Sequence, residues 1–224
     1  MMRVALWCTL LAVSFAGAAS AEQTGRRLFT TQSANGEIAG WKSFHADPNT
    51  KTGDVWKLSA DGVLLCKGTP QGYLYTEQQL TDVRLELEWR WPPEAKPGSG
   101  GLLLRMTGEH RIWPKSLEVQ LNHGQAGDFW GLAGYGLIGA AERMESLESP
   151  KFGKLTHVKF TQPLEKPAGQ WNHCAVELRG DRISVRINGQ QVNVAERCDA
   201  AAGPLVLTAE GAEIHFRNVI LLEP

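Results

Sequence analysis

The sequence predicts an all-β protein, a two-sheet antiparallel jelly-roll sandwich. From about residue 54 onward, short alternating or apolar segments are separated by Gly, Pro, Asn and Asp. No long amphipathic helix interrupts these segments. Roughly a dozen such segments follow one another, and this number suits two packed sheets better than a small barrel.

The clearest strand is TDVRLELEWRW, residues 81–91. Its apolar residues, from Val83 to Trp91, alternate with charged residues from Asp82 to Arg90. Successive side chains of a strand point to opposite faces. We therefore expect this strand to pack one face on the core and to expose the other to water.

Turn residues connect the predicted strands. Asp61-Gly62 lies between VWKLS and GVLLC, and Asn188-Gly189 lies between ISVRI and QQVNV. Both pairs suit the positive φ angles of tight hairpin turns. The RGDR sequence at 179–182 is expected to turn the preceding pair, so the last three of these strands should form a meander.

We predict one folded domain, residues 38–224, within the 224-residue chain. A single all-β domain of this length can bury a substantial core. Residues 22–37 form a polar segment ahead of it and are expected to be loosely held. Two stretches of the domain, 92–99 and 140–153, lack strand character and are expected to be loops, the second with room for one helical turn.

The first 21 residues have the pattern of a cleavable signal peptide. A short basic start at Arg3 precedes an apolar stretch and a small-residue end at Ala19-Ser20-Ala21. The apolar stretch is too short to span a bilayer comfortably. We therefore predict a periplasmic or secreted protein that does not insert into the membrane after cleavage.

The charge pattern indicates no nucleic-acid partner. The formal net charge is -1, and the 23 Lys and Arg residues are scattered along the chain. A nucleic-acid footprint or a membrane-surface patch would gather basic residues together.

Three cysteines remain after the signal peptide: Cys66, Cys174 and Cys198. At most one intramolecular disulfide can form, and Cys174 with Cys198 is the closest pair in sequence. The chain has no CxxC or Cys/His ligand spacing, so we predict no metal site. Participation of a divalent cation as cofactor is left open.

The segment SLEVQLNHG, residues 116–124, places Glu118, Gln120 and Asn122 on one face of a predicted strand. A half-buried strand with a solvated polar face explains such a pattern. A row of donors and acceptors for a ligand explains it as well.

Several segments together resemble one known family. They are GVLLCKGTPQGYLYTEQQLTDVRLELEWRWP, SGGLLLRM, SLEVQLN, EKPAGQWNHCAVELRGDRISVRINGQQVN and GPLVLTAEGAEIHFRNVILL. In this order they look like the motifs of the 3-keto-disaccharide hydrolase domain, over roughly residues 38–224. That family has the concanavalin A-like lectin/glucanase fold, a curved two-sheet jelly roll, so the resemblance implies that the polar row lines a concave sheet where a sugar lies.

The resemblance implies a glycoside substrate whose sugar ring is already oxidised at C3. The ketone acidifies the C2 proton, so a base can remove it and the group at C1 can leave by elimination, with water adding afterwards. Glu118 is the predicted base and Arg105 the predicted clamp for the carbonyl or enolate oxygen. Gln120 and Asn122 are predicted to bind ring hydroxyls.

Three more residues are predicted to contact the sugar. Trp113 and Trp130 are expected in loops beside the polar strand, where an exposed indole can stack on a sugar face. The family commonly has LQDHG where this chain has LTAEG at 207–211. Glu210 therefore stands in place of the family's histidine.

Two alternative functions stay open. A carbohydrate-binding, lectin-like domain also has a polar concave face with aromatic platforms. An ordinary glycoside hydrolase of this fold needs two carboxylates flanking the glycosidic bond. Glu118 has no second carboxylate on its own strand, but Glu210 from a neighbouring strand is a possible partner.

Overall fold

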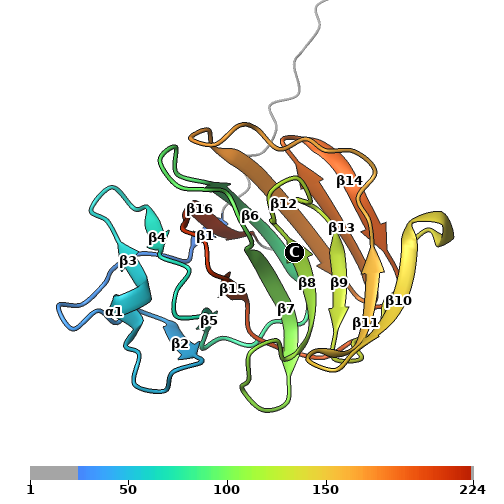
Figure 1. Ribbon diagram of the computed structural model, residues 1–224, viewed down its shortest axis with the longest axis horizontal. Coiled ribbons are helices and arrows are strands. Elements are labelled where there is room, and N and C mark those ends of the chain that lie inside the picture. Colours follow the sequence, from blue (N-terminus) through green and yellow to red (C-terminus); the bar gives the residue numbers. More distant parts are fainter. Residues whose placement is uncertain (1–24, 223–224) are drawn as a thin grey trace, which may run out of the picture.

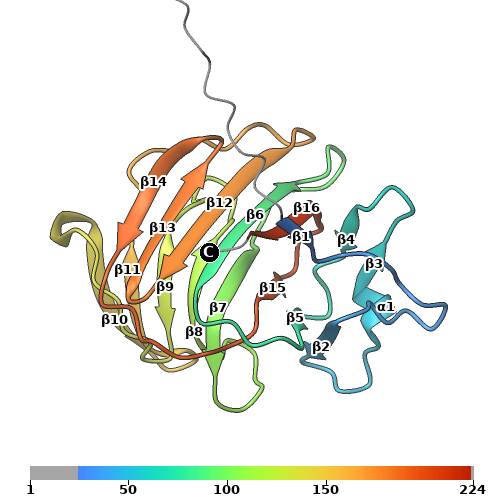
Figure 2. The same ribbon diagram turned by 180° about the vertical axis from the view of Figure 1, so that it is seen from behind.

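The computed structural model describes residues 25–222, and the predicted signal peptide lies outside them. Within this range the strands form two antiparallel sheets of eight strands each, which confirms the all-β jelly-roll prediction. We call them the front sheet, nearer the viewer in Figure 1, and the back sheet, nearer the viewer in Figure 2. No helix among the described residues is both long enough and apolar enough to cross a membrane.

The elements are as follows. In spatial order, the back sheet consists of β14 (Gln190–Ala195), β13 (Arg182–Ile187), β12 (Asn172–Arg179), β6 (Val83–Arg90), β16 (Ile214–Leu222), β4 (Leu64–Cys66) and β3 (Trp56–Leu58), with β1 (Gly25–Arg27) also paired to β16. The front sheet consists of β10 (Met144–Ser149), β11 (Gly153–Val158), β9 (Phe129–Leu132), β8 (Lys115–Gln120), β7 (Gly101–Thr107), β15 (Val206–Ala209), β5 (Gly72–Thr76) and β2 (Trp41–His45). The helical elements are α1 (Thr52–Val55) and a 3-10 turn, η1 (Ala141–Arg143).

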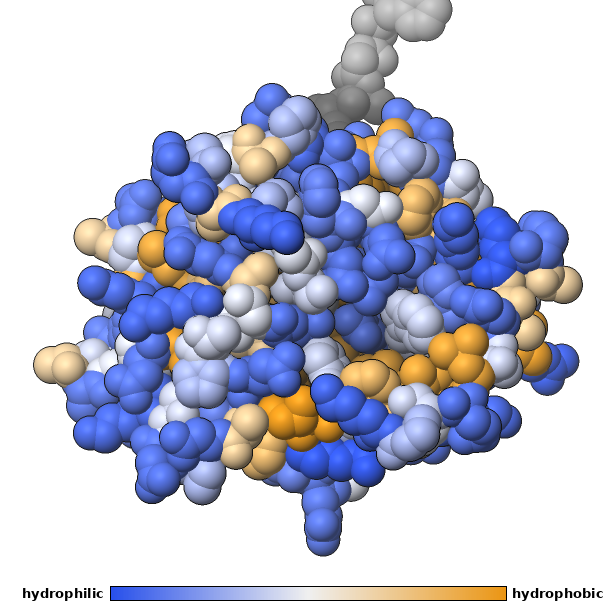
Figure 3. All heavy atoms as spheres, viewed as in Figure 1, coloured by the Kyte–Doolittle hydropathy of each residue, from blue (hydrophilic) through white to orange (hydrophobic). Residues whose placement is uncertain are grey.

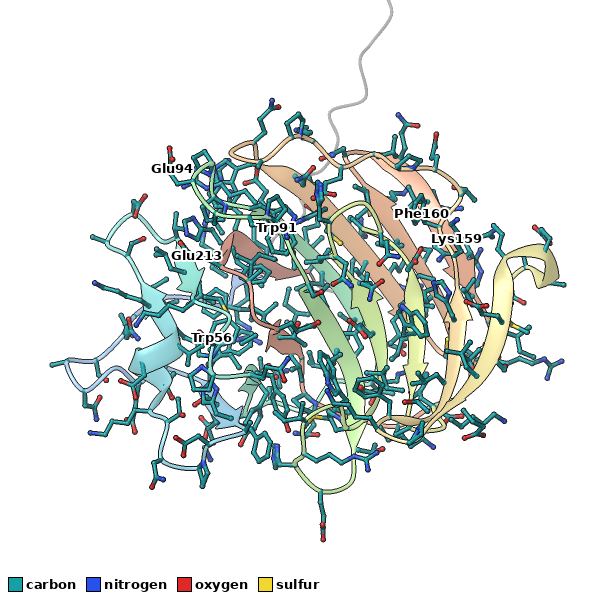
Figure 4. The ribbon with its side chains drawn as sticks, in the orientation of Figure 1. Trp56, Trp91, Glu94, Lys159, Phe160 and Glu213 are labelled. Carbon is teal, nitrogen blue, oxygen red and sulfur yellow. The ribbon has the colours of Figure 1, made fainter. Side chains whose placement is uncertain are left out.

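The main core lies between the two sheets. Strand β6 alternates buried and half-buried residues along its whole length, as its sequence predicts. The facing side chains of the front sheet, such as Leu104 on β7 and Leu117 on β8, are fully buried. Burial of each such side chain contributes roughly 1.5–3 kcal/mol. Figure 4 labels two tryptophans that lie inside the fold, Trp56 and Trp91.

The predicted hairpins are present. Asn188 and Gly189 have φ angles of 50° and 86° at the turn between β13 and β14, and Gly62 has a φ of 80° between β3 and β4. Strands β12, β13 and β14 pair consecutively, which confirms the predicted meander.

The structure corrects two expectations about irregular segments. The described part of 22–37 is not loosely held, because β1 pairs with β16 and Leu28 is buried. The stretch 140–153 contains the expected helical turn, η1, but most of it is strand β10 and not a loop. Strand β10 is an edge strand that is mostly exposed, so its sequence lacks the apolar alternation that marks a half-buried strand.

The outer face of the front sheet is buried as well. Six of the seven residues of β7 are buried, and a second apolar cluster, separate from the main core, includes Leu103, Leu155 and Val206. Trp113, from the loop after β7, and Phe152, from the β10–β11 turn, pack on this cluster. The middle of the front sheet is therefore covered on both sides.

Arg105 joins the end of β7 to three loops of the back sheet. It sits at a bulge in the β7–β8 pairing, with a φ of 52°. Its guanidinium donates hydrogen bonds to the backbone carbonyls of Thr81 at 2.8 and 3.0 Å, Gly180 at 2.6 Å and Asp199 at 3.0 Å. The residue is 1% exposed. Arg105 is therefore a structural residue, and its guanidinium is not free to clamp a substrate oxygen.

We predict that Arg105→Lys destabilises the fold by about 3 kcal/mol, because one ammonium group cannot reach all three carbonyls and leaves buried acceptors unpaired. Thermal or urea unfolding measures this loss. Arg182→Lys is the matched control, since the Arg182 side chain is 55% exposed. An Arg105→Lys protein with unchanged stability and no activity would contradict this structural role.

Candidate functional site

A pocket of about 190 Å³ opens on the outer face of the front sheet. In Figure 3, which has the orientation of Figure 1, this face is hollowed, and apolar side chains gather along one margin of the hollow. The lining residues come from β8, β9, β11 and three adjoining loops: Trp113, Glu118, Gln120, Trp130, Leu132, Phe152, Leu155 and Glu210. Five of the sequence-predicted site residues, Glu118, Gln120, Trp113, Trp130 and Glu210, thus lie together.

A larger hollow of about 660 Å³ lies near the N-terminal segment 31–43. Two of its charged residues, Lys42 and Glu77, form an ion pair at 3.0 Å, and both side chains are more than half exposed. Exposed, paired charges have little reason to be reactive. We therefore place the candidate site in the smaller pocket.

Glu118 lies in the floor of the pocket. It pairs across the front sheet with Leu103 on β7 and Trp130 on β9. The neighbouring residue on that face of β7 is Gly101, and a Cβ atom there would lie 2.7 Å from Glu118 Oε1. Gly101 thus provides the space that the Glu118 carboxyl group occupies.

The carboxyl group of Glu118 is strongly desolvated. The residue is 4% exposed, and Oε1 has no hydrogen-bond partner. Burial, followed by the negative charges of Glu210 and Asp128, raises the pKa of Glu118 well above its usual value. Glu118 therefore favours its protonated form.

Glu210 follows β15 and lines the same pocket. Burial raises the pKa of Glu210 to about 7, against the opposing effect of a hydrogen bond with Thr208. Its Oε1 also lacks a hydrogen-bond partner. Because the two carboxyl groups repel each other when both are ionised, near neutral pH they hold about one proton between them.

Gln120 and Trp130 form one wall of the pocket. Trp130 lies on β9, not in a loop as predicted, and its Nε1 donates to Gln120 Oε1 at 3.2 Å. An indole N–H can only donate, so this contact fixes the amide with its Nε2 free to donate. Gln120 can therefore offer a hydrogen bond to a ligand oxygen.

His157, the register partner of Trp130 on the adjacent strand β11, stacks against the indole. The two rings stack with centroids 4.1 Å apart and an interplanar angle of 8°. His157 also forms ion pairs with Asp128 at 2.8 Å and Glu145 at 3.0 Å. Burial lowers the pKa of His157, but the hydrogen bonds with the two carboxylates outweigh this effect and raise it above its usual value.

Asp128 holds His157 in place beside Trp130. Its other carboxylate oxygen accepts a hydrogen bond at 2.7 Å from the backbone N–H of Phe160, labelled in Figure 4. The sequence pattern did not reveal this group, because His157 stands alone in its strand. It meets Trp130 only through the pairing of β11 with β9.

Two predicted residues lie outside the pocket. Arg105 is held by backbone carbonyls, as described above. Asn122 lies beyond the end of β8, and its side-chain oxygen accepts a hydrogen bond at 2.9 Å from the backbone N–H of Gly100. Asn122 thus fixes the chain that leads into β7 and does not line the pocket.

Cys66, Cys174 and Cys198 are free and buried. Burial raises the pKa of the three thiols, to about 12 for Cys66 and Cys174 and to about 11 for Cys198. They are therefore poor nucleophiles. Within residues 25–222, no three His, Cys, Asp or Glu side chains converge to hold a metal ion.

We predict that Glu210→Gln stabilises the protein by about 2 kcal/mol at pH 8 and has little effect at pH 4. The folded-state pKa of Glu210 lies above its usual value of 4.5. Its contribution to stability is therefore fully present below pH 4.5 and is lost as the pH rises through about 7. Thermal unfolding across this range measures the difference between variant and wild type.

The matched control for this measurement is Glu177→Gln, on the exposed side of β12. His157 titrates in both proteins, so its effect cancels in the difference. Equal stabilities of wild type and Glu210→Gln at pH 8 would contradict the raised pKa.

Several solved structures share this fold. A proposed glycosyl hydrolase from Parabacteroides distasonis matches with a TM-score of 0.56 and 15% identity, over 83% of this chain and 88% of that chain. The carbohydrate-binding module CBM66 from Bacillus subtilis matches with a TM-score of 0.54 and 15% identity, over 80% and 93%. A β-glucanase from Bacillus licheniformis matches with a TM-score of 0.54 and 10% identity, over 85% and 95%.

These likenesses show a fold shared with glycosyl hydrolases and carbohydrate-binding modules. The sequence has no significant match among curated proteins. The profile of one family matches residues 28–221, in agreement with the resemblance seen in the sequence motifs. The chain therefore belongs to the 3-keto-alpha-glucoside-1,2-lyase-like domain family.

Proposed function

We propose that this protein cleaves a 3-keto-glycoside in the front-sheet pocket, by removal of the C2 proton, elimination of the group at C1 and addition of water. One observation carries the proposal. Glu118 and Glu210 line the same pocket, each has a raised pKa and each has a carboxyl oxygen without a hydrogen-bond partner. One shared proton makes the pair an acid and a base at the same pH.

The different burial of the two groups suggests their roles. Glu118 is 4% exposed, whereas Glu210 is partly exposed to solvent. A negative charge is therefore less costly on Glu210. We assign Glu210 as the base and Glu118 as the proton donor, whereas the sequence alone suggested Glu118 as the base.

The proposed reaction begins at C2. The Glu210 carboxylate takes the C2 proton, and the C–H electron pair moves toward the ketone to form an enolate. Gln120 Nε2 donates a hydrogen bond to the enolate oxygen. The enolate then expels the oxygen at C1, a C1–C2 double bond forms, and Glu118 protonates the departing oxygen.

Hydration returns both groups to their starting states. Elimination leaves Glu118 ionised and Glu210 protonated. Glu118 then takes a proton from water as its oxygen adds to C1, and Glu210 returns a proton to C2. The products are a 3-keto sugar and an alcohol, and no other reactant is consumed.

A carbohydrate-binding role is the second candidate. The flat Trp130 indole, held by His157 and Gln120, is suited to stacking on a sugar ring. The matched CBM66 structure shows that binding modules use this fold. Such a domain would retain sugars without changing them.

Product release from a 3-keto-glucoside and from its unoxidised parent tests the proposal. We predict release from the keto sugar alone, with a loss of about 10²–10⁴-fold in both Glu118→Gln and Glu210→Gln. Sugar binding should survive in both variants, because glutamine keeps the shape of the side chain. Glu177→Gln is the control that should keep full activity.

Other outcomes would replace the proposal. Release from the unoxidised parent would indicate an ordinary glycoside hydrolase that uses the same two carboxyl groups. Binding without release from either compound would indicate a binding domain. Full activity in both glutamine variants would exclude the carboxyl pair as the acid and base.

We also propose that the protein is exported, on the basis of the signal pattern in residues 1–21. Expression of the full chain in a secreting host should give a mature protein that begins at Glu22. Mass spectrometry of the purified protein measures this end. A retained Met1 in the same host would contradict export by this signal.

A further inference from the structure

We infer that the group released at C1 is an apolar aglycone, an aryl or alkyl alcohol, and not a second sugar. This inference rests on the proposed function and names its substrate class. It comes from the uneven distribution of polar groups around the pocket. Among the described residues that line the pocket, Glu118, Gln120 and Glu210 supply the polar groups on one side, and the lining of the other side is apolar.

The apolar side is a strip that runs across three strands. Leu132 on β9 lies two residues beyond Trp130, so both side chains point to the same face. Leu155 lies two residues before His157 on the neighbouring β11. Leu147 on β10 pairs with Leu155 and continues the strip to the sheet edge.

Two aromatic side chains close this strip. Trp113 and Phe152 pack edge to face, with ring centroids 5.9 Å apart, and both line the pocket. We call these five residues the apolar strip: Trp113, Leu132, Leu147, Phe152 and Leu155. Trp113 Nε1 is buried, so it presents no accessible N–H to a ligand.

The strip lies one step along the strands from the reacting groups. Glu118 pairs with Trp130, and the next outward-facing pair is Ser116 with Leu132. The Ser116 hydroxyl is buried and bonded to the backbone carbonyl of Pro114 at 3.0 Å. A sugar ring held at Glu118, Gln120 and Glu210 therefore has its substituent directed along an apolar surface when C1 faces the strip.

A second sugar is a poor fit for this surface. Each hydroxyl group that loses water without gaining a hydrogen bond costs about 1–3 kcal/mol. A ring or chain of carbon atoms would gain from the same surface. Leu147 extends this apolar surface to the sheet edge, where its side chain is 38% exposed.

The test compares benzyl and methyl 3-keto-glucosides with a 3-keto-disaccharide. Benzyl alcohol and methanol have similar acidity, so their departure from C1 is about equally easy. We predict that the benzyl compound has a kcat/KM on the order of 10- to 100-fold above the methyl compound. The disaccharide should not exceed the methyl compound.

Substitutions in the apolar strip test whether these residues cause the preference for the benzyl compound. Leu147→Asn and Phe152→Ala should each reduce the ratio of benzyl to methyl kcat/KM by about threefold or more, since each removes part of the apolar contact. Ile138→Asn is the matched control, because Ile138 is 49% exposed and lines a different hollow. A preference for the disaccharide, equal use of the two glycosides, or an unchanged ratio in both strip variants would overturn the inference.

A binding measurement distinguishes a failure of this inference from a failure of the proposed function. The dissociation constants of unoxidised benzyl and methyl glucosides can be measured by titration of wild type with tryptophan fluorescence as the signal. This measurement requires no turnover. If no keto-glycoside is cleaved but the benzyl compound binds at least about tenfold more tightly, the proposed chemistry fails and the apolar strip stands. If both compounds bind equally, or neither binds, the inference about the strip fails.

Discussion

The burial of the front sheet on both faces is the constraint on which the site depends. Its inner face packs on the main core, and its outer face is covered by the loop that carries Trp113 and by the turn that carries Phe152. A carboxyl group on that outer face is therefore removed from water even though it points away from the core. This explains why Glu118 has a raised pKa and why the nearby charge of Glu210 affects it. A polar row on a solvated sheet would have neither property.

The polar residues of the front sheet have different roles. Arg105, near the end of β7, binds loops of the back sheet. Among residues 25–222, no lysine or arginine side chain lines the pocket. The proposed acid and base chemistry then depends on two carboxyl groups from separate segments, Glu118 on β8 and Glu210 just after β15. Gly101 makes this arrangement possible, because only a residue without a side chain leaves room for Glu118.

Local patterns predicted what depends on local geometry. The alternation of a strand places Glu118 and Gln120 on one face, and both line the pocket. The direction of Arg105 depends on a bulge, which the alternation does not reveal. Strand β10 has no fully buried face and so carries no apolar signal. The support of Trp130 by His157 requires the register between β9 and β11, which no single segment contains.

The central claim is that Glu118 and Glu210 share about one proton at neutral pH. Carboxyl titration by ¹³C NMR, on protein labelled at glutamate and assigned with the two glutamine variants, tests this claim most directly. We expect one carboxyl group to titrate near pH 7 in the wild type and the pKa of Glu118 to fall in Glu210→Gln, because the repulsion between the two groups is then absent. Two carboxyl groups that both titrate near pH 4.5, unaffected by each other's replacement, would contradict the claim.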